Sequence, residues 1–228
     1  MKLKGKTVLV TGGARRIGAV IAEALSKRGA KVAIHSHQAG KGAFQADLSD
    51  MAAVAKLVED VEKKMGPIQI LINNAAIFEK IPFLEVREKD FDRHLHINLK
   101  APFFLSQAVA TSMLKNKEGK IINIADVSAF KPYLGFSHYS ATKAGLIALT
   151  KSLARELAPH VQVNAIALGP TLAPESYSKE EMKKIADKTL LKKWGGPNEV
   201  ANAVCFLIEG TDSATGSVLT IDGGRLLV

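Results

Sequence analysis

The stretch that decides the fold is Thr11-Gly12-Gly13-Ala14-Arg15-Arg16-Ile17-Gly18. It follows a short apolar run at 7–11 and opens a segment with helical spacing at 17–27. Glycines between a strand and a helix let the backbone turn sharply and approach a pyrophosphate, which then lies at the positive N-terminus of the helix. A plain tight turn is the alternative, but the flanking strand and helix favour a phosphate-binding turn.

The same alternation of short β-branched runs and helical segments continues along the chain. We expect strands at 7–11, 31–35, 43–46, 68–73, 120–125, 161–167 and 217–222, and helices at 17–27, 49–64, 91–114, 139–158 and 198–209. The strands are continuously apolar, which is typical of strands buried on both faces. The pattern predicts an α/β fold with one doubly wound (Rossmann) parallel sheet of about seven strands and helices on both faces.

Composition bounds the domain count and the compartment. Of the 228 residues, 47% are hydrophobic and 23% charged, near the globular average, and we find no linker or repeat. We therefore expect one domain over 1–228, with a polar substrate loop around 171–193 that includes a helix over the site. The single cysteine, Cys205, lies in an apolar helical pattern and is predicted to be an inert core thiol. With no signal peptide or membrane span in view, we expect a cytoplasmic protein.

The net charge of +9 raises the question of nucleic acid. The lysines are spread over many segments, often beside glutamate, and no aromatic residues interleave with a basic stripe. We therefore predict no nucleic-acid or membrane partner. A positive field would also steer a polyanionic cofactor towards its site.

The end of the second strand indicates which cofactor binds. A nicotinamide cofactor without a 2′-phosphate is usually held there by an acidic residue, but this strand ends in His35-Ser36-His37-Gln38. Neutral or cationic donors and a hydroxyl suit a phosphate, and Arg15, Arg16 and Lys41 could supply charge. The pattern favours NADPH over NADH, although the histidines could be plain surface residues.

Tyr139 and Lys143 are four residues apart on an expected helix, so both project from one face. A phenol has a pKa of about 10, and a neighbouring ammonium should lower it. The pair would then serve as a general acid. Alone, Tyr-x-x-x-Lys arises often by chance, so its value depends on other motifs.

Those motifs recur in order along the whole chain. They are the turn read as Thr-Gly-x-x-x-Gly-x-Gly with Arg16 at its middle glycine position, Asn73-Asn74-Ala75-Ala76, Asn98, Leu168-Gly169-Pro170-Thr171 and Ile221-Asp222-Gly223-Gly224. Together they resemble the signatures of the short-chain dehydrogenase/reductase family. By that resemblance, NADP(H) would bind at Gly12, Arg15, Arg16, Ile17, Gly18, His35, Ser36, His37, Asp47, Leu48, Asn74, Ala75, Tyr139, Lys143, Gly169, Pro170 and Thr171.

The resemblance implies further roles. Asn98 would hold a water that feeds the proton relay through Lys143, and Asp222-Gly223-Gly224 would be structural. His35 and Asp47 are only 12 residues apart, too few for the helix that usually joins these strands. The helices at 91–114 and 139–158 are apolar on more than one side, as in family members that pack there into a homotetramer or homodimer. A deeper core within one subunit is the alternative.

One departure concerns the substrate. The family usually places a serine 13 residues before the tyrosine, where this chain has Asp126, and Ser128 would need a local bulge to replace it. Reducing a ketone builds negative charge on oxygen, which an ionised aspartate would repel. Reducing a C=N bond creates no oxyanion, and a carboxyl group can accept N–H bonds or help pass a proton through Tyr139.

Asp126 and four other features resemble one subgroup of the family. Arg16, the His-x-His after the second strand, Asp126, Phe78 and Arg225 resemble the pteridine reductases and the bacterial dihydromonapterin reductases, although Gln38 replaces an arginine of the eukaryotic enzymes. In that subgroup the pterin lies between the phenylalanine and the nicotinamide.

We therefore predict an NADPH-dependent reductase of a reduced pterin, such as dihydromonapterin, dihydrobiopterin or dihydrofolate. Its catalytic residues would be Asp126, Tyr139, Lys143 and Asn98, and its substrate residues Arg16, Phe78, Asp126 and Tyr139. Phe78 could instead cap a hydrophobic loop, and Asp126 could turn away.

Two other functions stay open. The first is a 3-oxoacyl-[acyl-carrier-protein]-type carbonyl reductase, and the second is a non-enzymatic NADP-binding sensor. Sensors of this kind commonly lose the tyrosine or the lysine, which this chain keeps. We predict no metal site, since His94 and His96 lack a partner at ligand spacing and are interpreted as surface or loop-facing residues.

Overall fold

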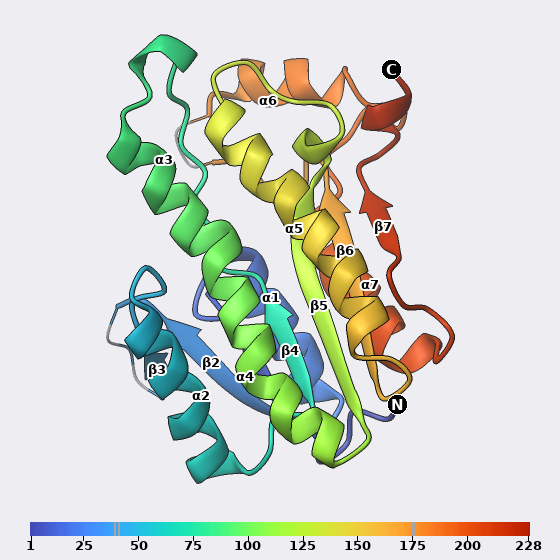
Figure 1. The fold of residues 1–228 in the computed structure, drawn as a ribbon. Helices are drawn as coiled ribbons and strands as arrows, with labels where there is room; N and C mark the ends of the chain where they lie inside the picture. Colours follow the sequence, from blue (N-terminus) through green and yellow to red (C-terminus); the bar gives the residue numbers. More distant parts are fainter. Residues whose placement is uncertain (39, 41, 175–176) are drawn as a thin grey trace.

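A parallel sheet of seven strands, in the order β3-β2-β1-β4-β5-β6-β7, forms the centre of the molecule (Figure 1). The computed structural model describes residues 1–38, 40, 42–174 and 177–228. The strands are β1 (Thr7–Val10), β2 (Lys31–Ser36), β3 (Phe44–Gln45), β4 (Ile70–Asn73), β5 (Gly119–Asp126), β6 (Val161–Leu168) and β7 (Val218–Ile221). The helices are α1 (Arg16–Lys27), α2 (Met51–Met65), α3 (Glu88–Leu95), α4 (Ala101–Lys115), α5 (Ser137–Glu156), α6 (Lys179–Ala186) and α7 (Pro197–Cys205).

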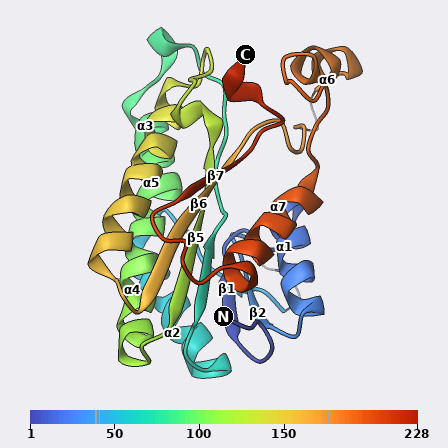
Figure 2. The ribbon, with the colours of Figure 1, turned by 90° about the vertical axis from the view of Figure 1, so that its right-hand side faces the viewer.

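Helices cover both faces of the sheet. In Figure 2, α2, α4 and α5 lie on one side and α1 and α7 on the other. Residues alternate between the two cores along each strand: Val8 and Val10 pack on the α1 side with Ile21, whereas Leu9 packs on the α2 side with Leu57. This alternation confirms the doubly wound fold and explains why the strands are continuously apolar.

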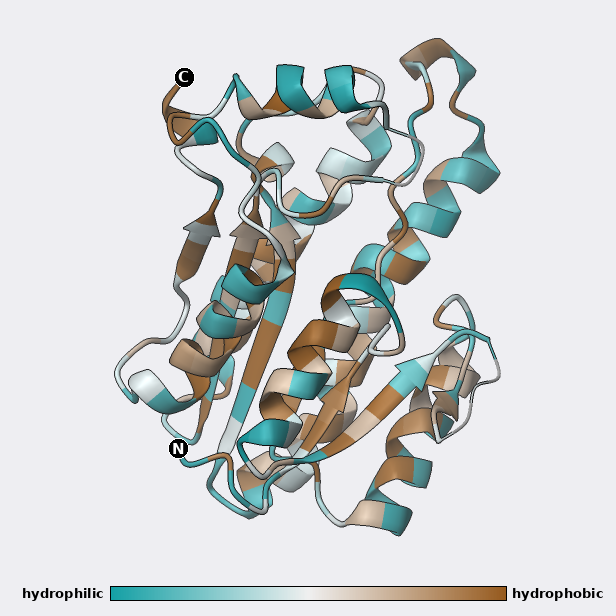
Figure 3. Ribbon diagram, turned by 180° about the vertical axis from the view of Figure 1, so that it is seen from behind, coloured by the Kyte–Doolittle hydropathy of each residue, from teal (hydrophilic) through white to brown (hydrophobic). Residues whose placement is uncertain are grey.

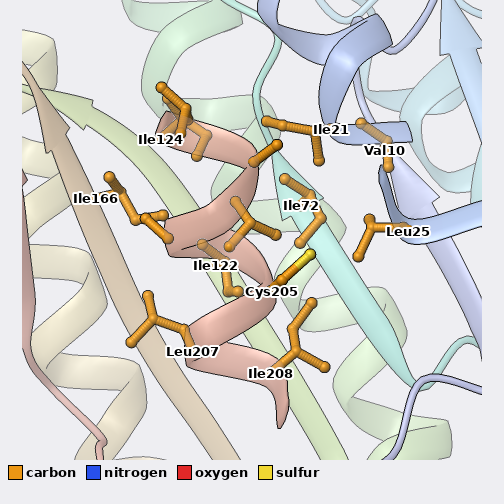
Figure 4. Close-up of a cluster of buried hydrophobic side chains, with 14 of the residues drawn as sticks. Val10, Ile21, Leu25, Ile72, Ile122, Ile124, Ile166, Cys205, Leu207 and Ile208 are labelled. Atoms are coloured by element: carbon orange, nitrogen blue, oxygen red, sulfur yellow. The ribbon is translucent and has the colours of Figure 1, made fainter. Parts of the chain in front are cut away.

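The α7 side of the core contains the single cysteine. Cys205 is 3% exposed and lies among Leu25, Ile72, Ile122 and Ile208 (Figure 4). Burial raises the pKa of its thiol above the usual value. The structure thus confirms a buried thiol that stays protonated at neutral pH.

The segment 91–114, predicted as one helix, has a different structure. α3 ends at Leu95, a π-helix spans His96–Lys100, and α4 begins at Ala101. Pro102 stands in the first turn of α4, where its ring and missing N–H disturb the bonding to the preceding turn. A second π-helix, Phe206–Gly210, likewise shortens the helix expected at 198–209.

The carboxyl ends of the strands carry the longer connections. α6 and the short 3₁₀ helices Phe83–Glu85 and Arg225–Leu227 lie beyond this edge of the sheet (Figure 1). Figure 3 shows mainly hydrophilic residues on α6, in contrast to the apolar central strands. Within the parts of 36–44 that the structure describes, no helix joins β2 to β3, as the short interval predicted. None of the helices in the described ranges is long and apolar enough to cross a membrane.

Candidate active site

The glycine turn is held by close backbone packing. Gly12 has a φ of +61°, and a side chain on Gly18 would place its Cβ 2.2 Å from the Gly12 carbonyl oxygen. The Asn74 amide donates to the carbonyl of Thr11 at 2.8 Å and to that of Gly12 at 3.3 Å. Gly18 therefore admits no side chain, and the left-handed conformation of Gly12 favours glycine. The turn leaves backbone N–H groups near the start of α1.

Position 16 carries an arginine although its backbone conformation favours glycine. Its φ of +53° lies in the left-handed region, where an arginine is strained. Its guanidinium reaches across the site and donates to the carbonyls of Leu172 and Ala173 at 3.3 and 3.0 Å. Arg16 therefore joins the glycine turn to the segment that follows β6.

A first cavity of about 610 Å³ extends from the glycine turn to the end of β2. Twelve of the predicted cofactor residues line it: Gly12, Arg15, Arg16, Ile17, Gly18, His35, Ser36, His37, Asp47, Leu48, Asn74 and Ala75. Arg15, Arg16 and Arg93 give it positive charge, against the single carboxylate of Asp47 among the described lining residues. This chemistry suits an anionic dinucleotide. Lys41, named as a further source of charge, lies outside the described residues.

The two histidines of this cavity differ in their surroundings. His37 is exposed, and its Nδ1 lies 4.0 Å from the Asp47 carboxylate. His35 is 2% exposed and both of its ring nitrogens have partners, the N–H of Gly12 and the carbonyl of Ala46. His35 therefore lines the cavity, but both of its ring nitrogens are bonded to the backbone, so its contact with a phosphate stays a prediction.

A second cavity of about 560 Å³ adjoins the first, and Arg16, Ile17, Asn74 and Ala76 line both. Its described lining includes the other predicted site residues except Asn98, namely Phe78, Asp126, Tyr139, Lys143, Gly169, Pro170 and Thr171. Its wall also includes Tyr133, Phe136, Tyr177, Trp194 and Arg225. The cavity is therefore mostly aromatic and apolar, with a few polar groups that converge on Tyr139.

The side chains of Tyr139 and Lys143 lie together on α5. The Tyr139 hydroxyl is 3.3 Å from Asp126 Oδ2, and Lys143 Nζ donates to the Ile124 carbonyl at 2.7 Å. Burial, and then the Asp126 charge, raise the pKa of Tyr139 well above its usual value. Burial lowers the pKa of Lys143 to about 8. The expected lowering of the tyrosine pKa by Lys143 is therefore wrong here, because burial and the carboxylate dominate.

Asp126 occupies the position expected from the sequence. Burial raises the pKa of its carboxyl group, although the backbone N–H of Ser128 opposes this by donating to Oδ1 at 2.7 Å. Ser128 is fully buried and is absent from the described lining of the second cavity. The structure thus places Asp126, rather than Ser128, at the Tyr139 hydroxyl.

Asn98 lies in the π-helix and its amide is occupied. It accepts from the N–H of Ile77 at 2.9 Å and donates to the Ile77 carbonyl at 3.0 Å. These bonds fix the chain immediately before Phe78. The water-holding role of Asn98 stays a prediction.

Three aromatic residues form one wall. Phe78 stacks on Phe136 with centroids 4.3 Å apart, and meets Tyr139 edge-on at 4.8 Å. Sequence reasoning missed Phe136 and Tyr133, three and six residues before Tyr139. The carboxylate of Asp126 contributes, after burial, to raising the pKa of Tyr133. Their place in the loop that leads into the tyrosine's helix was the available signal.

The interpretation of His94 as a surface residue is wrong. His94 is 0% exposed, bonds the Asp90 carbonyl through Nδ1 at 2.8 Å, and lies edge-on to His138 at 4.3 Å. It faces inward because α3 packs on α5 at this point. His96 is half-buried.

The family model for short chain dehydrogenase matches residues 6–184, most of the chain. The chain belongs to the short-chain dehydrogenase family. This establishes an NAD(P)-dependent oxidoreductase and confirms the family resemblance of the motifs.

Similar proteins cover the whole chain. The 3-oxoacyl-[acyl-carrier-protein] reductase FabG of Aquifex aeolicus is 37% identical, over 98% of this chain and 98% of that protein. The 5-keto-D-gluconate 5-reductase of Escherichia coli (strain K12) is 34% identical, over 99% and 97%. The crystal structure of a blue fluorescent protein from a metagenomic library, in complex with NADPH, has a TM-score of 0.90 at 33% identity and covers 99% of each chain. None of these three names refers to a pterin, so the comparisons give no support to the predicted subgroup within this dehydrogenase family.

Proposed function

We propose that this short-chain dehydrogenase is an NADPH-dependent reductase of a flat nitrogen heterocycle, with a reduced pterin as the candidate substrate. The observation that carries the proposal is the Asp126 carboxyl group 3.3 Å from the Tyr139 hydroxyl, in an aromatic cavity. A carboxyl group there can accept N–H bonds from a ring or donate a proton to its nitrogen.

The preference for NADPH rests on the end of β2. Ser36 and His37 line the first cavity there, and Arg15 and Arg16 belong to the same lining. A hydroxyl and cations suit a 2′-phosphate, whereas an acidic residue would suit a free ribose hydroxyl. A structurally similar protein, 33% identical, has been solved with NADPH bound.

The residues around Tyr139 would control protons and orientation. When bound, NADPH supplies the hydride. Tyr139 keeps its proton at neutral pH because burial and Asp126 raise its pKa, so its hydroxyl serves as a donor. Asp126, whose own pKa is raised by burial, would bind the ring N–H groups or return a proton to Tyr139. Lys143, bonded to the Ile124 carbonyl, would hold the ribose of the cofactor.

The walls of the second cavity would position a flat ring. Phe78 offers an aromatic face and stays 41% exposed. Arg16 lies at the junction of the two cavities, where a cation can contact the ring or the phosphates. We also propose that the described parts of 171–193 form the substrate loop, since Thr171, Tyr177 and Lys188 line the cavity.

A carbonyl reductase of the 3-oxoacyl-[acyl-carrier-protein] type is the second candidate. The names of the relatives favour it over pterin reduction. A protonated Asp126 could donate to a carbonyl oxygen together with Tyr139. The retained Tyr139 and Lys143 make a non-enzymatic NADP sensor the weaker alternative.

Exposed apolar residues on the helices support an oligomer. Phe103 and Phe104 of α4 are 42% and 36% exposed, and Phe91 of α3 is 41% exposed. Large exposed side chains in one region favour a protein interface. We propose a homotetramer or homodimer through this face, which a measurement of molar mass in solution tests.

One assay separates the candidate substrates. NADPH oxidation should be followed with dihydromonapterin or dihydrobiopterin, a 3-oxoacyl thioester and a 5-keto sugar acid under matched conditions. Turnover of a pterin alone would support the main proposal. Turnover of the thioester or the keto acid alone would support carbonyl reduction, and tight NADPH binding without turnover would support a sensor.

A further inference from the structure

The buried side chain of His35 connects three segments of the cofactor site. Its ring lies at the end of β2, beneath the glycine turn and beside the residues that follow β3. Nδ1 is 3.1 Å from the backbone nitrogen of Gly12, and Nε2 is 3.1 Å from the carbonyl oxygen of Ala46. The backbone carbonyl of His35 also accepts from the N–H of Gly13 at 3.0 Å.

These partners define one protonation state. A backbone N–H can only donate, so Nδ1 must carry a lone pair. A carbonyl can only accept, so Nε2 must carry the proton. His35 is therefore neutral in this arrangement, and both of its nitrogens are satisfied although the residue is only 2% exposed.

The bond to Gly12 fixes one side of the turn. The other side is fixed by the Asn74 amide, which donates to the Gly12 carbonyl at 3.3 Å. Gly12 also has a φ of +61°, a conformation that the flexible backbone of glycine does not hold by itself. His35 and Asn74 thus hold the first glycine between them.

We propose that His35 is a positioning residue for the phosphate-binding turn, and that its protonation in mild acid releases Gly12 and weakens dinucleotide binding. The inference rests on the dinucleotide site of the proposed function. Protonation would place N–H groups on both ring nitrogens. The Nδ1–H group would then point at the N–H of Gly12, so two donors would face each other and their hydrogen bond would be lost. The turn would then have to move away from the ring.

The surroundings of His35 disfavour its protonated form in the present arrangement. Burial lowers the pKa of His35, and the neighbouring His37 lowers it further, while the bond to Ala46 acts in the opposite sense. Arg15 and Arg16 on the turn and Asp47 after β3 line the same cavity, with the carboxylate nearest to His37. The charged form of His35 is therefore disfavoured while its ring stays buried beneath the turn.

His37 provides an internal contrast. It is exposed and lines the same cavity, and its Nδ1 lies near the Asp47 carboxylate. His35 is the histidine whose ring bonds Gly12. The acid-induced loss of dinucleotide binding should therefore depend on His35.

The test is the dissociation constant of NADP⁺ between about pH 8 and pH 5, followed by the fluorescence of Trp194, the single tryptophan. NAD⁺ is titrated in parallel, since the 2′-phosphate itself titrates near pH 6. His35→Leu removes the acceptor, and His35→Asn keeps an acceptor that does not titrate. His37→Asn, titrated with NAD⁺, which lacks the 2′-phosphate proposed to lie near His37, serves as the matched control two residues away.

We expect the wild type to lose about tenfold in affinity for both dinucleotides towards pH 5, the equivalent of one lost hydrogen bond. His35→Leu should bind about as weakly at pH 8 as the wild type does at pH 5. His35→Asn should bind well and lose the pH dependence, and His37→Asn should retain it.

An acid-induced loss that persists in His35→Asn, or that disappears in His37→Asn, would overturn the inference. Circular dichroism at each pH separates a change of the turn from unfolding. Tight binding by the wild type at pH 8 establishes the cofactor site by itself. Failure of the pH effect would therefore overturn the role of His35 and leave the proposed function intact.

Discussion

Replacing Phe78 with alanine should lower the turnover of a flat substrate and leave cofactor binding nearly unchanged. One face of the ring stacks on Phe136 at 4.3 Å with an interplanar angle of 11°, and its edge meets Tyr139. The side chain is nevertheless 41% exposed, so part of the ring is available to a ligand in the second cavity.

The magnitude follows from stacking energies. A base stacked on an aromatic side chain gains about 1–3 kcal/mol, so losing the ring should lower kcat/KM for a pterin by about fivefold to 150-fold. Phe78→Leu keeps apolar bulk but no ring, and it should lose most of the same activity. Since Phe78 is absent from the described lining of the first cavity, the dissociation constant of NADP⁺ should change by less than about threefold.

The assay compares kcat/KM for dihydrobiopterin and for a 3-oxoacyl thioester in the wild type and both variants. Thermal unfolding serves as the control, because removing a half-exposed phenylalanine should destabilise the fold by only about 2 kcal/mol. Unchanged pterin turnover in Phe78→Ala would refute the stacking role. So would an equal loss with the thioester, because that substrate has no flat ring.

Three other predictions concern stability and pH. Lys120→Met should lower the free energy of unfolding by about 3 kcal/mol, and Tm by about 6–12 °C. The reason is that the buried ammonium group of Lys120 donates to two backbone carbonyls. A smaller loss of unfolding free energy in urea titrations would contradict this. Burial lowers the pKa of His35 and His94, so the unfolded chain binds more protons in mild acid, and the free energy of unfolding should fall from about pH 7 to pH 5. Urea midpoints that stay constant over this range would argue against it. Burial lowers the pKa of Lys143 to about 8, so kcat/KM for reduction should fall as the pH rises through that value. An alkaline limb shifted well above this pH would show that another group titrates.

The fold could be predicted because its determinants are local. The glycine turn, the continuously apolar strands and the short interval between His35 and Asp47 are all visible in the sequence. Asp126 and Tyr139, 13 residues apart in the sequence, are also in contact: Asp126 ends β5, and Tyr139 lies in the first turn of α5.

The environment of the site residues could not be predicted in the same way. Burial is a property of the packed molecule, so the raised pKa of Tyr139 and the buried positions of His35 and His94 emerge only when distant elements meet. A helical pattern also gives no sign of a π-helix, and Asn98 lies in this one, where its amide bonds Ile77.

The most direct test of the central claim is kcat/KM for dihydromonapterin and for a 3-oxoacyl thioester in the wild type and in Asp126→Ser. If Asp126 selects a ring nitrogen substrate, the serine variant should lose about a hundredfold or more of its pterin turnover while the thioester gains. The NADP⁺ dissociation constant should stay close to that of the wild type. Full pterin activity in Asp126→Ser, or wild-type turnover of the thioester alone, would contradict the role assigned to Asp126.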